Sequence, residues 1–526
     1  MQLHSILKMH INSKVVARIR MAPESNTHIK RNLRVGGTLV CWVSALKRDA
    51  WEWISANEKR IIEGSDTVWK LAELGLVEEK SSKFLASILK ENGFAIEMGV
   101  AGMPTAFVAT FGKGKPTIGF MGEYDALPGL SQKPVPYQDP IEEGAPGHGC
   151  GHNIHGMTGV MGAIATKVVM EKHGLKGTLK FFGTPAEETY SGKVFMVRAG
   201  CFDGVDAVFS HHPSSFNVAG LGSSLAMNSV KFHFYGKTAH AAATPYVGRS
   251  ALDAVELMDV GVNFMREHVV PEARVHYVIE KGGVQPNVVP DYARTWYYVR
   301  APEREQVNHI YDWVLKIAEG AALMTQTDLK VEFIEGLSNV IPSEGMSEVI
   351  TTNMRQVGAP EYTEEELKFA EEMSKTVTRE DKRELLRATR RPGWEQLVED
   401  GIHIDREIHD PWDRGIYWPG STDVGDVSWI VPTMEFTTAT TTLEAAGHDW
   451  RITACCGMSI GHKSLIFATK VIAGSAVDLI TKPEILKKIK DEHAEKMKGR
   501  KYVCPIPEEI KPPLEIAREQ ASKQRT

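Results

Sequence analysis

Cysteine is scarce in this sequence, with six residues among 526. So few cysteines in a long chain cannot form a disulfide framework, which excludes the class of small disulfide-stapled secreted domains. Most of the cysteines are therefore expected to be reduced thiols in core or surface positions. The compartment that matches reduced thiols is the cytoplasm.

An excess of charge of one sign is also missing. The formal net charge is −6 and the isoelectric point is near 6.4. This balance provides no basic surface for nucleic acid or for an anionic membrane, and neither is expected as a partner. The apolar fraction of 42% and the charged fraction of 24% are ordinary for a soluble globular enzyme. At this length we expect two domains with extensions.

The N-terminal region has no apolar run long enough to cross a bilayer. Its run Val35–Leu46 is well short of the roughly 20 residues that a spanning helix needs. Basic residues dominate the segment before it, where Glu24 is the acidic exception. A signal peptide is one interpretation, but the charged part is unusually long and no small-x-small cleavage site is obvious. We interpret residues 1–48 as a basic extension with little order.

The chain does contain a regular alternation of β-type and helical runs. Two amphipathic helices are predicted first, over Trp51–Leu76 and Ser81–Asn92. After them, strand and helix patterns alternate, and this order predicts an α/β layer fold with functional residues in the loops that follow the strands. The predicted strands are Thr105–Thr110, Thr117–Met121, Thr178–Gly183 and Ala207–His211, with helices up to His173 and over Lys193–Ala199.

After Asn217 the order becomes βαββαβ, which is typical of a ferredoxin-like split-βαβ unit. A second domain is therefore expected to be inserted into the first. We divide the chain into an extension (1–48), a first domain in two parts (49–222 and 339–486), the insertion (223–338) and a C-terminal tail (487–526). The expected elements of the insertion are Val230–Tyr235, Ala251–Val269, Arg274–Lys281, Ala293–Arg300, Glu303–Ala321 and Leu329–Ile334.

The second part of the first domain carries a charged helical excursion over Thr363–Asp400. Its simplest interpretation is a solvated pair of helices. The segment from Cys455 to Ile480 follows, and then a Lys-rich helix near Ile485–Lys498. The proline-rich tail after it is expected to wrap the surface.

The hexapeptide His148-Gly149-Cys150-Gly151-His152-Asn153 precedes the helix that runs to His173. Cys150 and His152 are two residues apart, so in an extended or turning segment their side chains point to the same side. A thiolate and an imidazole that converge in this way form half of a metal site. A buried cysteine beside histidines at a helix start is the alternative interpretation of this hexapeptide alone.

Further candidate ligands and acid–base residues recur at the ends of successive elements. Such recurrence is unlikely by chance and favours a metal site. These residues are Asp125, the pair Glu187 and Glu188, His212, and His462 near the C-terminal helix.

A pair of divalent cations would explain this mixture of residues. Two cations can share a water, lower its pKa and stabilise the oxyanion that forms when the water attacks a carbonyl. One of the adjacent glutamates, Glu187 or Glu188, would bind metal while the other takes the proton of the water. Asp125 could orient an imidazole of the site.

With these residues in view, the chain resembles the di-metal aminoacylase/carboxypeptidase superfamily (peptidase family M20), in particular an amidohydrolase branch that includes aminobenzoyl-glutamate hydrolases. The similarity extends from about Trp51 to the proline-rich tail. Besides the Cys-Gly-His loop, the matching strings are Val100-Ala101-Gly102-Met103-Pro104-Thr105-Ala106, Gly122-Glu123-Tyr124-Asp125-Ala126-Leu127-Pro128-Gly129-Leu130-Ser131, Pro185-Ala186-Glu187-Glu188 and Ser421-Thr422-Asp423-Val424-Gly425-Asp426-Val427-Ser428-Trp429.

The resemblance implies a zinc-peptidase-like catalytic domain, a mixed sheet flanked by helices, with an inserted ferredoxin-like lid and dimerisation domain. It implies Glu187 as the general base. It also implies that His240, in Gly236-Lys237-Thr238-Ala239-His240, reaches the active site of a partner protomer, and that Asn287 contacts substrate. A substrate role is assigned to His448. The implied metal ligands are Cys150, His152, Glu188, His212 (rather than its neighbour His211) and His462.

Two departures from the family pattern stand out. Asn153 replaces an aspartate that many members carry, so one supporting acid is missing. Thr189-Tyr190-Ser191 replaces a glycine run, which would narrow the pocket.

The function that follows is a metal-dependent amidohydrolase, with two Mn²⁺ or Zn²⁺ ions, that cleaves the amide between an aryl or acyl group and an amino acid. A homodimer or heterodimer through the lid is expected. The alternatives are a dipeptidase for peptides with a basic C-terminal residue, an aromatic-amine deaminase, and a non-catalytic partner chain of a hetero-oligomer.

Overall fold

The computed structural model describes residues 34–35, 38–39 and 44–523. The predicted basic extension lies mostly outside the described residues. Within it, β1 (Arg34–Val35) and β2 (Thr38–Leu39) pair as a short antiparallel ladder. Residues Val43–Thr526 form one compact unit of chain contacts.

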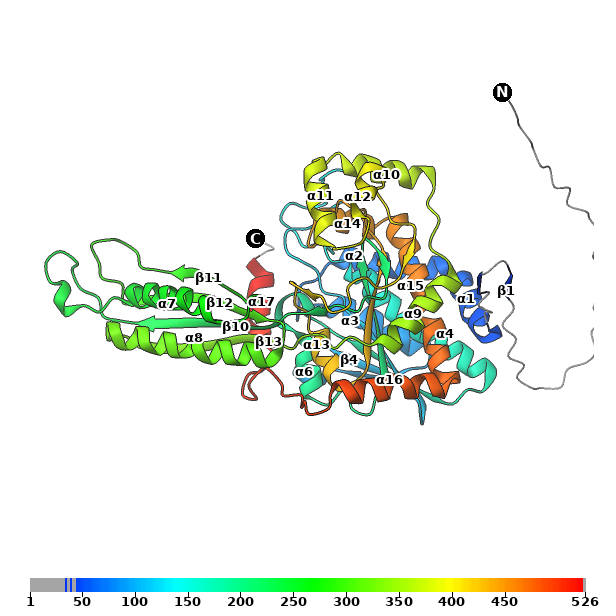
Figure 1. The fold of residues 1–526 in the computed structure, drawn as a ribbon, viewed down its shortest axis with the longest axis horizontal. Coiled ribbons are helices and arrows are strands. Elements are labelled where there is room, and N and C mark those ends of the chain that lie inside the picture. The colour runs from blue at the N-terminus through cyan, green and yellow to red at the C-terminus, as the bar shows by residue number, and fades with distance from the viewer. Residues whose placement is uncertain (1–33, 36–37, 40–43, 524–526) are drawn as a thin grey trace, which may run out of the picture. The chain divides into compact units, whose positions relative to one another are not determined.

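The core of this unit is an eight-stranded mixed sheet with helices on its faces (Figure 1). The strands β5, β6, β7 and β16 at its centre run parallel, whereas β3 pairs antiparallel to β4 and β4 to β6. At the other edge, β8 is antiparallel to β16 and parallel to β14. The α/β prediction is confirmed. In sheet order the strands are β14 (Ile408–His409), β8 (Asn217–Val218), β16 (Thr433–Ala439), β7 (Ala207–Ser214), β5 (Thr117–Gly122), β6 (Gly177–Gly183), β4 (Phe107–Lys113) and β3 (Ala95–Met98).

Two long apolar helices, α4 (His152–His173) and α15 (Ser459–Thr481), pack on each other and on the central strands. Gly156 lets α4 approach the sheet, because a Cβ there would lie 2.6 Å from the carbonyl oxygen of Glu123. Among the described helices, α15 is the one long and apolar enough to cross a membrane, but 83% of its apolar window is buried here. It is therefore a core helix of this fold.

The N-terminal region contains two helices where the sequence predicted one long helix. The predicted helix over 51–76 is two helices, α1 (Ala45–Ala56) and α2 (Glu58–Leu71). Asn57 separates them because its side-chain amide donates to the carbonyl of Trp53 and closes α1. The next helix, α3 (Glu79–Glu91), agrees with the prediction.

The inserted segment forms a second, four-stranded sheet in the order β11-β12-β10-β13. Its helices α7 (Ala251–Met265) and α8 (Arg304–Thr325) pack on each other and on the sheet, which confirms the predicted βαββαβ order. Arg304 ties the base of this unit together, since its guanidinium donates to the carbonyls of Met227 and Leu337. The strands are β10 (Ala226–Tyr235), β11 (Arg274–Lys281), β12 (Tyr292–Ala301) and β13 (Asp328–Leu337).

The charged excursion is more than a solvated helical pair, so that interpretation was wrong. It contains three helices, α10 (Glu364–Ser374), α11 (Arg379–Ala388) and α12 (Trp394–Glu399), seen together in yellow-green in Figure 1. Leu386 and Val398 pack into an apolar cluster with Phe216 and Val218 of the segment after β7. The chain then pairs β14 with β8, and β15 (Tyr417–Trp418) with β9 (Ser223–Ser224).

The C-terminal part contains α16 (Pro483–Lys496) and, within the proline-rich tail, α17 (Leu514–Lys523). The tail is held by Arg198, which donates to the carbonyls of Pro507 and Ile510. The remaining helices are α5 (Glu187–Tyr190), α6 (Gly192–Arg198), α9 (Glu344–Val357), α13 (Val424–Ile430) and α14 (Trp450–Cys456), with 3-10 turns at Val100–Gly102, Pro245–Val247 and Arg266–His268.

Candidate metal centre

The N-terminus of α4 presents two of the predicted ligands. Cys150 and His152 flank Gly151, whose φ of 79° starts the helix from a left-handed turn. A Cβ at Gly151 would lie 2.7 Å from Pro213 and 3.0 Å from the Sγ of Cys456, so only glycine fits. This close packing holds the Cys-Gly-His loop against the end of β7.

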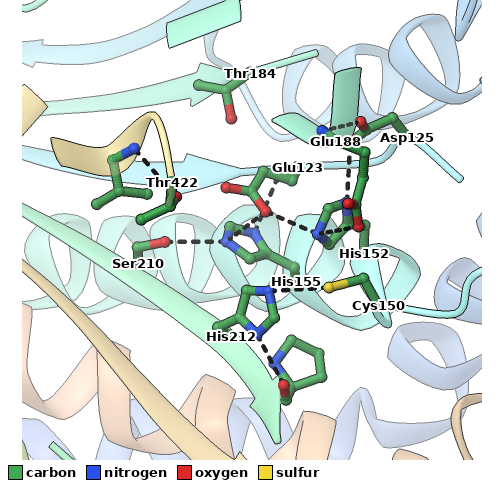
Figure 2. A network of polar contacts seen from close by, with 12 residues as sticks. Glu123, Asp125, Cys150, His152, His155, Thr184, Glu188, Ser210, His212 and Thr422 are labelled. Carbon is green, nitrogen blue, oxygen red and sulfur yellow. Dashed lines mark hydrogen bonds and ion pairs between the residues drawn. The ribbon is translucent and has the colours of Figure 1, made fainter. Parts of the chain in front are cut away.

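The end of β7 supplies the third predicted ligand. The Nε2 atom of His212 lies 3.4 Å from the Sγ of Cys150, and its Nδ1 lies 2.8 Å from the carbonyl oxygen of Pro213. The neighbouring His211 points to the other face of the sheet, where its Nε2 contacts the hydroxyl of Thr438. Of the two histidines, His212 is therefore the one that faces Cys150 and His152, and Figure 2 shows it opposite α4.

The paired glutamates enter from the start of α5. The backbone N–H of Glu188 donates to Asp125 Oδ2 (3.0 Å), and its carboxylate lies 3.8 Å from the Nε2 of His152. Asp125 also contacts the Nδ1 of His152 at 2.8 Å, so it orients this imidazole as the sequence suggests. Glu187, His152 and Glu123 bring one ligand atom each within 4.8 Å of one another. Both glutamates thus lie at the site but face different neighbours.

The fifth predicted ligand, His462, is not brought into this centre. Its Nε2 lies 2.9 Å from a carboxylate oxygen of Asp66, and the residue takes part in none of the His/Cys/Asp/Glu groups found among the described residues. The structure places His448 there instead, with its Nε2 3.0 Å from Glu188 Oε2 and grouped with Cys150. By position, His448 and not His462 lies beside the other candidate ligands, and the choice of ligand stays a prediction.

Sequence reasoning missed two residues beside the centre, Glu123 and His155. The Oε2 of Glu123 lies 3.1 Å from His152 Nε2 and 3.5 Å from His155 Nε2. His155 is one helical turn after His152, so it faces the same side of α4. Its Nε2 also contacts the hydroxyl of Ser210 at 3.0 Å, as Figure 2 shows. The i, i+3 spacing of the two histidines was the available signal.

A buried lysine neutralises part of the acidic charge. Lys193 on α6 is fully buried, and its ammonium lies 2.6 Å from both Glu123 Oε1 and Asp423 Oδ1. Asp423 belongs to the Ser-Thr-Asp string quoted above, which had no role assigned. Burial raises the pKa of Asp423 to about 7 despite the lysine. The pair of ion contacts keeps the carboxylate of Glu123 in place beneath the histidines.

The ionisation of the site reflects strong burial among like charges. Burial, together with the charges of Glu123 and Glu188, raises the pKa of Glu187 well above its usual range. Burial likewise raises the pKa of the Cys150 thiol. Although burial lowers the pKa of His152, the nearby carboxylates of Glu123 and Asp125 raise it overall. In the absence of a cation these shifts favour the protonated carboxyl and thiol, and a bound cation would favour the charged forms that can act as ligands.

The residues present fit a pair of divalent cations. Thiol, imidazole and carboxylate donors suit zinc, and carboxylate donors also suit manganese. At the site, His152 Nε2, Glu188 Oε1 and both carboxylate oxygens of Glu123 are buried and make ion contacts but no hydrogen bond among the described residues, which is expected of atoms that can coordinate a metal. Four donor groups are found among the described residues, and Cys150 belongs to two of them, one with His152 and His212 and one with Glu188 and His448.

The predicted lid residues lie together, but outside these groups. His240 and Asn287 are both exposed, and the N–H of Ala241 donates to the carbonyl of Asn287 at 3.0 Å. The Nδ1 of His240 accepts from the N–H groups of Ala242 and Ala243, which leaves Nε2 for another partner. Their roles remain predictions.

Asn153, the residue that departs from the family pattern, is buried away from the carboxylates. Its amide donates to Ser65 Oγ and to the carbonyl of Cys456. An aspartate could not make these two donations, so the asparagine here serves the packing of α4.

Comparisons with known proteins identify the family of the chain. The family model for peptidases M20/M25/M40 matches residues 119–498. One of the p-aminobenzoyl-glutamate hydrolase subunits of Escherichia coli (strain K12) is 39% identical over 466 residues, covering 87% of this chain and 97% of that protein. Xaa-Arg dipeptidase of Mus musculus is 29% identical over 479 residues, covering 88% and 96%. A solved dinuclear metal-binding peptidase of the M20 family from Bacillus subtilis superposes with a TM-score of 0.53 at 18% identity, covering 81% of this chain and 99% of that one.

Proposed function

Because this chain belongs to peptidase family M20/M25/M40, we propose that it is a metal-dependent hydrolase of the amide between an aryl-acyl group and an amino acid. The observation that carries the proposal is the convergence of one thiol, three imidazoles and two adjacent glutamates at one end of the sheet. The relative of highest identity reported above is a p-aminobenzoyl-glutamate hydrolase subunit, so p-aminobenzoyl-glutamate is the first substrate to assay.

Cys150, His152, Glu188, His212 and His448 would hold two divalent cations, Mn²⁺ or Zn²⁺. When bound, the cations supply a water of lowered pKa and positive charge for the carbonyl oxygen of the substrate. Asp125 fixes the ring of His152 through Nδ1, so that Nε2 faces the site.

Glu187 is proposed as the general base. It lies within the group formed with Glu123 and His152, so its carboxylate is placed to take a proton from a water at the site and return it to the departing nitrogen. Its neighbour Glu188 is held by His448 and by the backbone contact to Asp125, so the two glutamates divide the roles of base and ligand.

The lid is proposed to mediate dimerisation and to supply His240 and Asn287 to the site of a partner protomer. Apolar side chains are exposed on α7 and on the edge strand β11, which supports an association through this unit. These side chains include Val260 (49% exposed), Phe264 (67%), Val278 (57%) and Ile279 (46%). Because the Escherichia coli relative is named as one subunit of its hydrolase, a heterodimer as well as a homodimer is proposed for this chain.

We propose a cytoplasmic location, since the described cysteines are all free thiols. The domain boundaries at 48, 222, 338 and 486 stay a proposal. The secondary structure supports those at 222 and 338, because the lid sheet begins at Ala226 and ends at Leu337, whereas α1 runs across 48 and α16 across 486.

A dipeptidase for peptides with a basic C-terminal residue is the second candidate. It is supported by the Xaa-Arg dipeptidase relative, at lower identity.

The proposal is tested with the purified full chain, loaded separately with Mn²⁺ and Zn²⁺. Turnover of p-aminobenzoyl-glutamate, acetyl-glutamate and Xaa-Arg dipeptides is compared, with gel filtration of the same sample. Hydrolysis of the first substrate in preference to the dipeptides is expected. Preference for Xaa-Arg would replace the proposal by the second candidate, and no hydrolysis of any substrate by the metal-loaded chain would contradict both.

A further inference from the structure

A cavity of about 430 Å³ opens between the end of the central sheet and the excursion that carries α10–α12. Its size is within the range of about 300–1,000 Å³ that is usual for small-molecule sites. The excursion and its return supply Thr389, Trp412, Asp413 and Trp418, and the segment after β7 supplies Phe216 and Val218.

The cavity adjoins the candidate metal centre through the register of two strands. On β16, Glu435 and Thr437 line the cavity, and they pair in register with Ser210 and His212 of β7. Partners in a parallel pair point to the same side of the sheet, so the cavity floor lies directly beside the imidazole of His212. Ser210 connects the two sites as well, since its hydroxyl contacts His155 Nε2 and donates to Glu435 Oε2.

The walls of the cavity are flat, apolar and fixed in position. Trp412 donates its indole N–H to the carbonyl of Thr389 (2.9 Å), and Trp418 donates to Asp413 Oδ2 (3.1 Å). Gly220 allows this wall to approach, since a Cβ there would lie 2.7 Å from Asp413 Oδ2. Aromatic side chains held in this way form a preorganised surface for another ring.

The charge of the lining decides which half of an acyl-amino acid can enter. Among the described residues that line the cavity, the charged ones are Asp413 and Glu435, and there is no lysine, arginine or histidine. The carboxylate of Asp413 already accepts hydrogen bonds from two donors, the indole N–H of Trp418 and the backbone N–H of Leu221. An amino-acid half with its free carboxylate would face two acids without a cation, which is unfavourable. A neutral ring, or a ring with an amino group that can donate to Glu435, meets no such penalty.

We propose that this cavity is the subsite for the aryl ring of the acyl half, and that it selects neutral or amine-bearing rings over anionic rings. The inference rests on the proposed hydrolysis of aryl-acyl amino acids and adds the residues that recognise the aryl group. The helical excursion thereby becomes a specificity element of the enzyme.

The test compares kcat/KM for p-aminobenzoyl-, benzoyl-, 4-carboxybenzoyl- and acetyl-glutamate in wild type, Trp412→Leu and Trp394→Leu. Trp394 packs in the same apolar cluster as Trp412 but does not line the cavity, so it is the matched control. Wild type should prefer the two uncharged aryl substrates, and Trp412→Leu should lower the aryl-to-acetyl ratio at least about 10-fold through KM, as expected from lost burial of a ring. Trp394→Leu should leave the ratio unchanged.

A second variant and a binding measurement keep the inference testable if Trp412→Leu fails to fold. Val340→Phe fills the cavity from another wall and should also lower the ratio. Quenching of tryptophan fluorescence by free 4-aminobenzamide, an uncharged analogue of the aryl-acyl half, should be weaker in either variant than in wild type, without any need for turnover. Equal loss of aryl and acetyl hydrolysis in a folded, metal-loaded variant, or a preference for 4-carboxybenzoyl-glutamate, would overturn the inference while leaving the amidohydrolase proposal intact. Absence of all hydrolysis would refute the proposed function, and the fluorescence result would then decide the subsite alone.

Discussion

His448 lies 3.0 Å from Glu188 through Nε2 and Oε2, whereas His462, only a short distance further along the chain, contacts Asp66. This pairing raises the pKa of His448 through its hydrogen bond to Glu188. Substitution of His448 is therefore expected to weaken metal binding, whereas substitution of His462 is not.

We expect His448→Ala to weaken binding of at least one cation by more than the ~10–100-fold typical of residues that only support a ligand. Metal content after dialysis, measured by mass spectrometry, reports this directly. His462→Ala is the matched control and should keep the full metal content. Loss of metal in His462→Ala, with retention in His448→Ala, would restore the sequence-based assignment.

Glu187→Gln should keep the metal and lose catalysis. The amide has nearly the shape of the carboxylate but cannot accept a proton, so kcat should fall by about 10²–10⁴, the usual contribution of a general base. Metal content and KM are measured alongside and should stay close to wild type. Turnover near the wild-type rate would show that another group takes the proton.

His240→Ala should reduce kcat severely without changing the metal content, because His240 is outside the metal-binding groups. If it acts on the partner's site, mixing inactive His240→Ala with inactive Glu187→Gln should regenerate activity. A mixed dimer combines one intact Glu187 with one intact His240 at the same site. Failure of the mixture to recover activity, with exchange of protomers verified by mass, would contradict a role across the interface.

The lid contains a buried carboxyl that should make stability depend on pH. Burial raises the pKa of Asp259 to about 6, while the hydroxyl of Tyr297 donates to it. Because the folded pKa exceeds the unfolded value, the folded state keeps a proton that the unfolded chain releases, and this stabilisation is lost as pH rises through 6. Between pH 5 and 7 the loss should be ~1 kcal/mol.

The measurement is chemical unfolding of the full chain at several pH values. The difference in the free energy of unfolding between wild type and Asp259→Asn should change with pH as the carboxyl of Asp259 titrates. Asp253→Asn, an exposed aspartate on the same helix, is the control. A difference between wild type and Asp259→Asn that is independent of pH would contradict the assignment.

Much of the fold could be predicted because most of its strands and helices have a clear local pattern of apolar residues. β11 begins and ends at the predicted residues, and the βαββαβ order followed from hydrophobic periodicity. The packing of the excursion could not be predicted in this way. Its helix α11 is strongly charged, and its few buried residues, such as Leu386, are too sparse in the sequence to show that they pack against another part of the chain.

The metal centre was predicted in part. Cys150 and His152 are a local motif, and His212 was selected over His211 by the resemblance to the family. His448 could not be selected over His462, since both follow a glycine and His448 lies in an irregular loop with a φ of 57°. Such a loop has no periodicity from which its direction could be read. The role of Glu123 could likewise not be predicted from the sequence, because it depends on an ion pair with Lys193, which lies on a helix about seventy residues later.

The sharing of Cys150 between His212 and His448 has a consequence for biosynthesis. During translation the lid segment and the excursion emerge from the ribosome before His448 does. The nascent chain therefore passes through a stage at which four of the five proposed donors have been made and His448 alone is missing. If His448 is a ligand as proposed, the group of Cys150, Glu188 and His448 is completed only at that late point of synthesis.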